Sequence, residues 1–263
     1  MPWLTSSGVS IHYKVGGRGP RSLILVHELG GSLDSWDAVL PVLESQFRVL
    51  RFDQRGAGLS EKVRRPFTVD DHVRDLEAAI SAAELAPPYC VVGLAAGAAV
   101  TIAFIHRESQ NVTAAVLCAA ATDVSPDRRQ FLLDRSELAQ REGMRAVADT
   151  TLSRSFPVVV RHDPSVYESY RGRLLANDPV CYALANGALL EANLDDAIAA
   201  LRCPCLVLAG VHDLLRPPED VKALASRLRG AEFATLETAH VMPVQAPAEF
   251  TQKVLGFFLR EQF

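Results

Sequence analysis

The sequence has no apolar run long enough to span a membrane and no excess of either charge. The one uncharged stretch that raises the question, residues 89–105, is shorter than the ~20 residues of a spanning helix and contains Gly93 and Gly97. The formal net charge is −4, without the clustered lysines and arginines that a polyanion-binding surface needs. We therefore expect neither a membrane nor a nucleic acid as a partner.

The sequence also lacks the usual signals for export, disulfides, metals and cofactors. Residues 1–10 contain no basic stretch followed by an apolar run and no lipidation motif, which predicts a cytoplasmic protein. The five cysteines are an odd number, scattered mostly in apolar runs, so we expect them to be reduced. Cys203 and Cys205 have no second pair of ligands, which predicts no metal site. Neither a Gly-x-Gly-x-x-Gly motif nor a phosphate loop occurs, which predicts a cofactor-free protein.

Short apolar runs rich in valine, leucine and isoleucine alternate with longer helical patterns. This alternation predicts an α/β fold with a mostly parallel sheet covered by helices on both faces. An earlier stretch, residues 9–15, ends at Gly16-Gly17 and is expected to begin the sheet as an antiparallel edge. The predicted strands after it are residues 22–26, 47–52, 89–94, 114–119, 205–209 and 232–236.

Three helices have clear starting signals. Thr68 is followed three residues later by Asp71, the arrangement of a capping box, and by apolar residues along one face. Another helix begins at Pro217-Pro218 with two acidic residues in its first turn, and the last begins near Pro247. Each is expected to return the chain to the sheet.

The strand signals disappear between about Asp123 and Asp195. This segment is typical of several short helices with polar faces, broken at Pro157, Pro164 and Pro179. We predict a single domain over residues 1–263, in which residues 123–195 form a helical cap insertion.

Five landmarks follow one another along the chain. They are His27-Glu28-Leu29-Gly30-Gly31 after one strand, residues 53–60 after the next, the turn Gly93-x-x-x-Gly97, and then Asp213 and His240. In this order they resemble the α/β-hydrolase superfamily, and within it the branch of 3-oxoadipate enol-lactonases, small esterases and carbon-carbon hydrolases. The resemblance implies the α/β-hydrolase fold and a small carbonyl compound as the substrate.

The turn between Gly93 and Gly97 resembles the family's nucleophile elbow, with Ala95 at its apex. Glycines at these two positions allow a strand and a helix to approach closely around a strained turn. An alanine offers neither a hydroxyl nor a thiol, so no acyl-enzyme can form there. The alternative for this segment is ordinary packing of a strand against a helix.

The resemblance also assigns the acid-base groups and the oxyanion hole. It implies that His240 is the general base and that Asp213 orients its imidazole. The backbone N–H groups of Leu29 and Ala96 correspond to the donors that stabilise an oxyanion, and they work equally with serine or water as the attacking group.

Glu28 is a second departure from the family, which usually has glycine after the histidine. A carboxylate beside the oxyanion loop suggests proton transfer if the side chain points inward. The alternative is a solvated or arginine-paired carboxylate. We interpret Asp53, Arg55 and His27 as structural, whereas for Trp36 both packing and pocket lining remain open.

Three functions are compatible with these residues. In the first, His240 and Asp213 activate water or take a proton directly from a substrate such as an ester, enol-lactone, amide or β-dicarbonyl compound, so that hydrolase, lyase, isomerase or decarboxylase chemistry is possible without serine. In the second, the chain is an ordinary serine hydrolase with an engineered serine-to-alanine change at position 95. In the third, it is a ligand receptor without catalysis.

Overall fold

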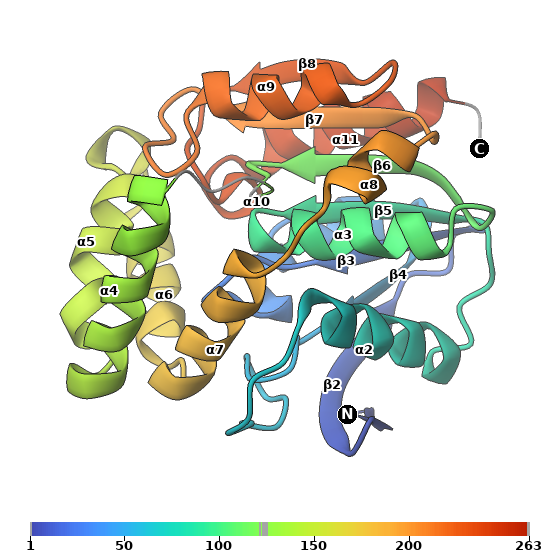
Figure 1. The fold of residues 1–263 in the computed structure, drawn as a ribbon. Helices are drawn as coiled ribbons and strands as arrows, with labels where there is room; N and C mark the ends of the chain where they lie inside the picture. Colours follow the sequence, from blue (N-terminus) through green and yellow to red (C-terminus); the bar gives the residue numbers. More distant parts are fainter. Residues whose placement is uncertain (1, 121, 123–125, 262–263) are drawn as a thin grey trace.

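An eight-stranded sheet forms the centre of the fold, in the order β1-β2-β4-β3-β5-β6-β7-β8 (Figure 1). The computed structural model describes residues 2–120, 122 and 126–261. Strands β3 to β8 are parallel to one another, whereas β2 is antiparallel to both of its neighbours, β1 and β4. The strands are β1 (Trp3–Ser6), β2 (Val9–Gly16), β3 (Arg21–Val26), β4 (Phe47–Phe52), β5 (Tyr89–Leu94), β6 (Val112–Cys118), β7 (Cys205–Gly210) and β8 (Glu232–Leu236).

The prediction that residues 9–15 form the edge of the sheet is wrong, although they do form an antiparallel strand. The four-residue strand β1 pairs outside β2, with Trp3 opposite His12, and is the true edge. Ser7 and Gly8, both with positive φ, make the tight turn that joins the two strands. The six other predicted strands are confirmed to within two residues at each end.

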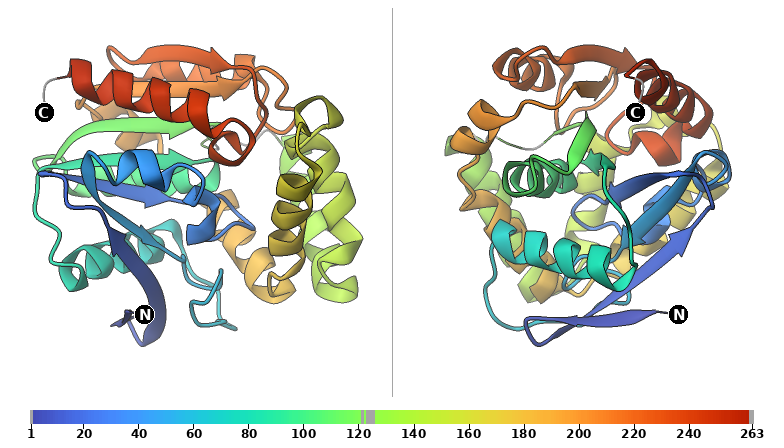
Figure 2. Two further views of the ribbon diagram at one scale, coloured as in Figure 1. Left: turned by 180° about the vertical axis from the view of Figure 1, so that it is seen from behind. Right: turned by 90° about the vertical axis from the view of Figure 1, so that its right-hand side faces the viewer.

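Helices cover both faces of the sheet, as expected for strands that are buried on both sides (Figure 2). One face packs against α2 (Val69–Ala82), α3 (Ala96–Arg107), α8 (Asp195–Ala200) and α9 (Pro218–Arg227). The other packs against η1 (Leu33–Trp36), α1 (Leu40–Leu43), α10 (Met242–Gln245) and α11 (Pro247–Arg260). Trp36 belongs to this second core, where its fully buried ring lies 6.3 Å from that of Phe250.

The capping box predicted at Thr68 is confirmed, because its hydroxyl accepts a hydrogen bond from the N–H of Asp71 while the Asp71 carboxylate accepts one from the N–H of Thr68. The helices predicted at Pro218 and Pro247 begin at those residues. Residues 89–105 form β5 and α3, and no helix in the described ranges is long and apolar enough to cross a membrane.

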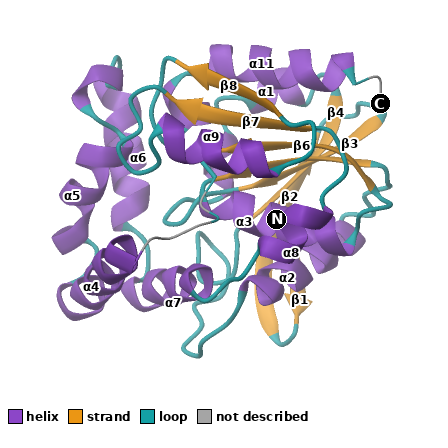
Figure 3. Ribbon diagram, turned by 45° about the horizontal axis from the view of Figure 1, so that its top comes forward, coloured by secondary structure: helices purple, strands orange, loops and turns teal. Residues whose placement is uncertain are grey.

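The helices between β6 and α8 lie beyond the carboxyl ends of the strands (Figures 1 and 3). We call them the cap: α4 (Pro126–Glu142), α5 (Arg145–Ser155), η2 (Val158–Val160), α6 (Pro164–Leu175) and α7 (Pro179–Leu190). The breaks predicted at Pro164 and Pro179 are confirmed, because each proline occupies the first turn of a new helix. The predicted start of the cap at Asp123 lies outside the described residues. Asp195 begins α8, which packs against the body of the fold at α3.

Candidate active site

The turn from β5 into α3 has the strained geometry that the two glycines predicted. Ala95 lies at its apex with φ 51° and ψ −111°, outside the regions that L-residues favour. A Cβ atom at Gly93 would lie 2.4 Å from Oγ1 of Thr101, and one at Gly97 would lie 2.2 Å from the carbonyl oxygen of Val26. Only glycine fits at both positions, and the close approach of strand and helix depends on it.

His240 and Asp213 come from the loops that follow β8 and β7, and they meet beside this turn. His240 Nδ1 lies 2.7 Å from Asp213 Oδ2. The other oxygen, Asp213 Oδ1, accepts hydrogen bonds from the backbone N–H groups of Leu215 (2.8 Å) and Arg216 (2.9 Å). Asp213 is buried, so its carboxylate is fixed, and it orients the imidazole with Nε2 left without a hydrogen bond to a described residue.

A cavity of about 770 Å³, including its opening to solvent, separates this end of the sheet from the cap. We call it the main cavity. Ala95, Ala96, Leu29, His240 and Glu28 all line it, so the structure brings five of the six predicted site residues to one space. The sixth, Asp213, lies behind His240.

Four hydroxyl groups from described residues of the cap line the main cavity, those of Thr151, Ser155, Tyr170 and Tyr182, and no pattern in the sequence predicted any of them. Thr151 donates to a backbone carbonyl of its own helix, and Tyr170 donates to Glu28. Ser155 Oγ is buried and makes no hydrogen bond to a described residue. None of the four is hydrogen-bonded to the His240 side chain, so none of them is poised as a replacement for a serine nucleophile.

Leu29 and Ala96 offer two backbone N–H groups at the edge of this cavity. Leu29 lies in the loop after β3, and Ala96 is the first residue of α3, where a helix leaves its N–H groups without internal acceptors. Neither N–H donates a hydrogen bond to any group in the described part of the chain. Two free donors beside a helix N-terminus can bind an oxyanion.

Glu28 is neither solvated nor paired with an arginine, so that alternative for its role is wrong. Its side chain is 1% exposed, and Oε1 accepts hydrogen bonds from Ser35 Oγ (2.9 Å) and from Tyr170 Oη (3.0 Å). Oε2 is buried and has no partner among the described residues. A Cβ atom at Gly31 would lie 2.3 Å from Oε1, so the chain leaves space for this carboxyl group. Burial, together with the charge and hydrogen bond of Glu28, raises the pKa of Tyr170 well above its ordinary value.

The loop after β4 is a scaffold, as the sequence predicted. Asp53 accepts hydrogen bonds from the backbone N–H groups of Leu33 (2.8 Å) and Leu59 (2.9 Å), which ties two loops together. Arg55 makes two hydrogen bonds of 2.7 Å to the fully buried Asp75 on α2. These charges are engaged inside the fold and are not available to a substrate.

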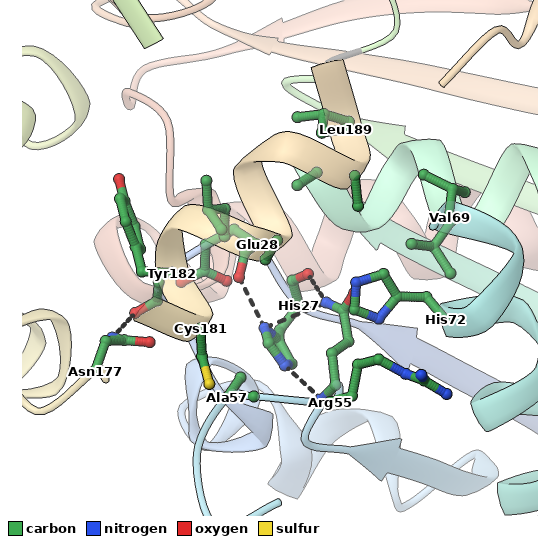
Figure 4. Close-up of a pocket in the computed structure, with 18 residues that line it drawn as sticks. His27, Glu28, Arg55, Ala57, Val69, His72, Asn177, Cys181, Tyr182 and Leu189 are labelled. Carbon is green, nitrogen blue, oxygen red and sulfur yellow. Dashed lines mark hydrogen bonds between the residues drawn. The ribbon is translucent and has the colours of Figure 1, made fainter. Parts of the chain in front are cut away.

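A second, smaller cavity of about 500 Å³, including its opening, lies between the loop at residues 27–30, the start of α2 and the cap helix α7 (Figure 4). We call it the side cavity. His27 anchors its wall, because Nδ1 lies 2.8 Å from the carbonyl oxygen of Glu28 and Nε2 accepts a hydrogen bond from the N–H of Gln54. This bears out the structural interpretation of His27.

The chain is similar to known proteins in sequence and in fold. Residues 20–240 match the family described as "Serine aminopeptidase, S33". The chain is 28% identical over 265 residues to a pyrrolizixenacetamide deacetylase of Xenorhabdus hominickii, and the match covers 95% of each protein.

Two solved structures have nearly the same fold. The enol-lactonase from Burkholderia xenovorans LB400 superimposes with a TM-score of 0.91 at 28% identity, covering 98% of this chain and 100% of the other. A malate-bound thermophilic esterase from Thermogutta terrifontis gives 0.91 at 25% identity, covering 100% and 99%. The chain therefore belongs to the "Serine aminopeptidase, S33" family and is a hydrolase of the α/β-hydrolase superfamily, in its enol-lactonase and esterase branch.

Proposed function

We propose that this protein hydrolyses a small carbonyl compound without a serine nucleophile and without a cofactor. His240 activates a water molecule, Asp213 orients His240, and Ala95 stands at the position of the family's nucleophile. The observation that carries this proposal is the 2.7 Å contact of His240 with Asp213 beside a turn whose apex has no nucleophilic atom. The relatives include a deacetylase, an enol-lactonase and an esterase, and these activities support a carbonyl substrate.

The positive φ of Ala95 and the two obligatory glycines support its assignment to the nucleophile position. A methyl group cannot attack a carbonyl, and among the described residues no cavity hydroxyl is hydrogen-bonded to the His240 side chain. Water is then the attacking group, and the imidazole is the base that its proton reaches.

The reaction follows from these positions. As the water oxygen bonds to the carbonyl carbon, one water proton moves to His240 Nε2 and the carbonyl electrons move onto oxygen. The N–H groups of Leu29 and Ala96 stabilise that oxyanion. When the intermediate collapses, the bond to the leaving group breaks and His240 returns the proton to it. The products are an acid and an alcohol, an amine or, from a β-dicarbonyl compound, a ketone.

We assign Glu28, which lines the same cavity, to a second proton transfer. Its support is the burial of its carboxyl group, the unpartnered Oε2, and the absence of a described cation to neutralise it. A buried polar atom without a partner is costly, and native structures keep such atoms mainly where they have a function. Glu28 lines the cavity together with Leu29, so it can exchange a proton with the oxygen that Leu29 and Ala96 hold, while His240 protonates the leaving group.

The test is turnover by three proteins on a panel of small esters, enol-lactones and β-diketones: the chain as it stands, Ala95→Ser and His240→Ala. We expect the first to be active and His240→Ala to lose about 10²- to 10⁴-fold, the usual contribution of a general base. Ser155→Ala is the matched control and should keep its activity.

Other outcomes would overturn the proposal. Activity in Ala95→Ser alone would identify a disabled serine hydrolase. Ligand binding without turnover in all three proteins would identify a receptor. Loss of activity in Ser155→Ala would place the nucleophile in the cap.

A further inference from the structure

The carboxyl end of the cap helix α5 is hydrogen-bonded to both loops that carry the acid-base pair. The carbonyl oxygen of Arg154 accepts the N–H of Leu214 at 3.2 Å, and Leu214 directly follows Asp213. The carbonyl oxygen of Ser155, the last residue of the helix, accepts the N–H of His240 at 3.2 Å. Two neighbouring residues of the cap therefore contact the loop of the base and the loop of the carboxylate that orients it.

These contacts satisfy carbonyl groups that a helix cannot satisfy by itself. The last four carbonyl groups of an α-helix have no donor within the helix, and a buried carbonyl left without a donor is costly. Ser155 is 3% exposed, so its carbonyl oxygen needs donors from the protein. Both contacts use main-chain atoms of the cap and do not depend on the Ser155 hydroxyl. We therefore expect the end of α5 and the two loops to hold each other in place.

Gln245 adds a side-chain link at the same point. Its Nε2 donates to the carbonyl oxygen of Ser155 at 2.8 Å. Its Oε1 accepts the hydroxyl of Thr238 at 2.8 Å and the N–H of Ala239 at 2.9 Å. The orientation of the amide follows from these partners, because the Ser155 carbonyl can only accept and the Ala239 N–H can only donate. One side chain thus joins the cap to the two residues that precede His240.

The segment around His240 is closed on itself by this side chain. Gln245 is the last residue of the short helix α10, and its backbone N–H donates to the carbonyl oxygen of Val241 at 3.1 Å. Its side chain turns back to Thr238 and Ala239, both of which are fully buried. The chain on either side of His240 is therefore held by one amide.

A general base is effective only when its backbone, as well as its ring, is in place. The hydrogen bond to Asp213 fixes the ring of His240 through one atom, Nδ1, at 2.7 Å. It cannot fix the distance between Nε2 and a reacting water if the loop itself shifts, and a displacement of about 1 Å can cost about a hundredfold in rate. Gln245 lies outside the described lining of both cavities, so it acts on the reaction through His240 and not through the substrate.

We infer that Gln245 is a positioning residue for His240, and that it acts by holding the loop of the base against the Ser155 carbonyl at the end of α5. The role in catalysis rests on the proposed function, whereas the hydrogen bonds that carry it do not. Asp213 orients the ring, and Gln245 places the main chain from which the ring extends. The docked cap is then part of the acid-base site, since α5 supplies the acceptor to which both His240 and Gln245 donate.

Gln245→Glu separates the link to the cap from the rest of the side chain. Glutamate keeps an oxygen for Thr238 and Ala239, but its carboxylate presents a second oxygen, not a donor, to the Ser155 carbonyl. We expect kcat on the best substrate of the panel to fall about ten- to a hundredfold with little change in KM, because the base moves while the substrate contacts stay. Gln252→Glu, the same substitution at an exposed position of α11, is the control and should behave like the unmodified chain.

The ring signals of His240 give a second measurement that needs no turnover. In NMR spectra of isotope-labelled unmodified protein we expect one tautomer, with a strongly deshielded Nδ1 proton in the hydrogen bond to Asp213. This signal is assigned by its absence in His240→Ala. In Gln245→Glu it should weaken or broaden, because the loops no longer hold donor and acceptor at one distance. In Gln252→Glu it should not change.

Gln245→Met covers the case in which the glutamate variant does not fold. Methionine has a similar length, brings no charge and makes none of the three hydrogen bonds of the Gln245 amide. We expect it to show the same fall in kcat and the same change in the His240 signal. Urea denaturation identifies the variants that are folded under the assay conditions.

Two results would overturn the inference. If folded Gln245→Glu or Gln245→Met loses stability but keeps both kcat and the His240 signal, Gln245 is a structural residue. If KM rises while kcat is unchanged, it acts on substrate binding. If the unmodified chain turns nothing over, the proposed function fails and the His240 signal alone decides: a change in Gln245→Glu but not in Gln252→Glu supports the positioning, and no change in either variant overturns it.

Discussion

The site contains two buried carboxyl groups, and they are held in opposite ways. Asp213 engages both oxygens, one with two backbone N–H groups and the other with His240. Glu28 engages one oxygen, with two hydroxyls, and its other oxygen has no described partner. The backbone around Asp213 fixes one orientation, which suits a group that orients a base. Glu28 depends on the cap through Tyr170, which suits a group whose hydrogen bonds change during a reaction.

The largest expected effect comes from Asp213→Asn. An amide nitrogen cannot accept the Nδ1–H of His240, so the imidazole loses its orientation and correct tautomer. We expect kcat to fall about 10³- to 10⁴-fold with little change in KM. Steady-state kinetics on the best substrate of the panel measure this. Asp195→Asn, in a surface ion pair with Arg227, is the control. A loss below about tenfold would remove the distinction between the two carboxyl groups.

Glu28→Gln should have a smaller catalytic effect. Glutamine keeps an oxygen that can accept from Ser35 and Tyr170, so the fold and KM should hardly change, while proton transfer is lost. We expect kcat to fall about 10- to 100-fold, the lower part of the range for acid-base groups. The exposed Glu237→Gln is the control. If kcat stays the same, Glu28 is a structural carboxylate, and the two carboxyl groups differ only in how the fold holds them.

Tyr170→Phe tests the dependence of Glu28 on the cap. The variant leaves the buried carboxyl group with one donor, so we expect the free energy of unfolding to fall by about 1–2 kcal/mol in urea denaturation. In a Glu28→Gln background the cost should be smaller, because a neutral acceptor loses less than a charged one. Tyr167→Phe is a matched control on the same helix, since the Tyr167 ring packs against Phe156 in a T-shaped contact and its hydroxyl makes no hydrogen bond to a described residue. An equal loss of unfolding free energy in both backgrounds would show that the stabilising effect of the Tyr170 hydroxyl does not act through Glu28.

These two carboxyl groups also mark how far the sequence could predict the structure. The glycines around Ala95 are a local pattern that predicted the turn, whereas the pairing of Asp213 with His240 was implied by the resemblance to the family. Tyr170 lies 142 residues from Glu28 along the chain, and no local pattern connects them. Helix starts and breaks in the cap were predicted from prolines, but which side chains the cap presents to the cavity depends on how it docks. The link between Gln245 and the cap followed only from the folded chain.

His72 gives the smallest expected effect. Like Glu28, and unlike Asp213, it is a buried titratable group with a polar atom, Nδ1, that has no partner among the described residues. Its pKa is lowered to about 3 by burial, with a smaller effect from Arg55, so between about pH 6.5 and pH 3 the unfolded chain binds a proton that the folded chain does not. Stability therefore falls as the pH drops through this window. From pH 7.5 to 5.5 the contribution is about 1.4 kcal/mol, set mainly by the unfolded pKa.

Urea denaturation of the unmodified chain and His72→Gln at both pH values measures this difference. We expect the unmodified chain to lose about 1.4 kcal/mol more than the variant on acidification. Equal losses would show that His72 takes up its proton in the folded state, which would put a positive charge into the side cavity.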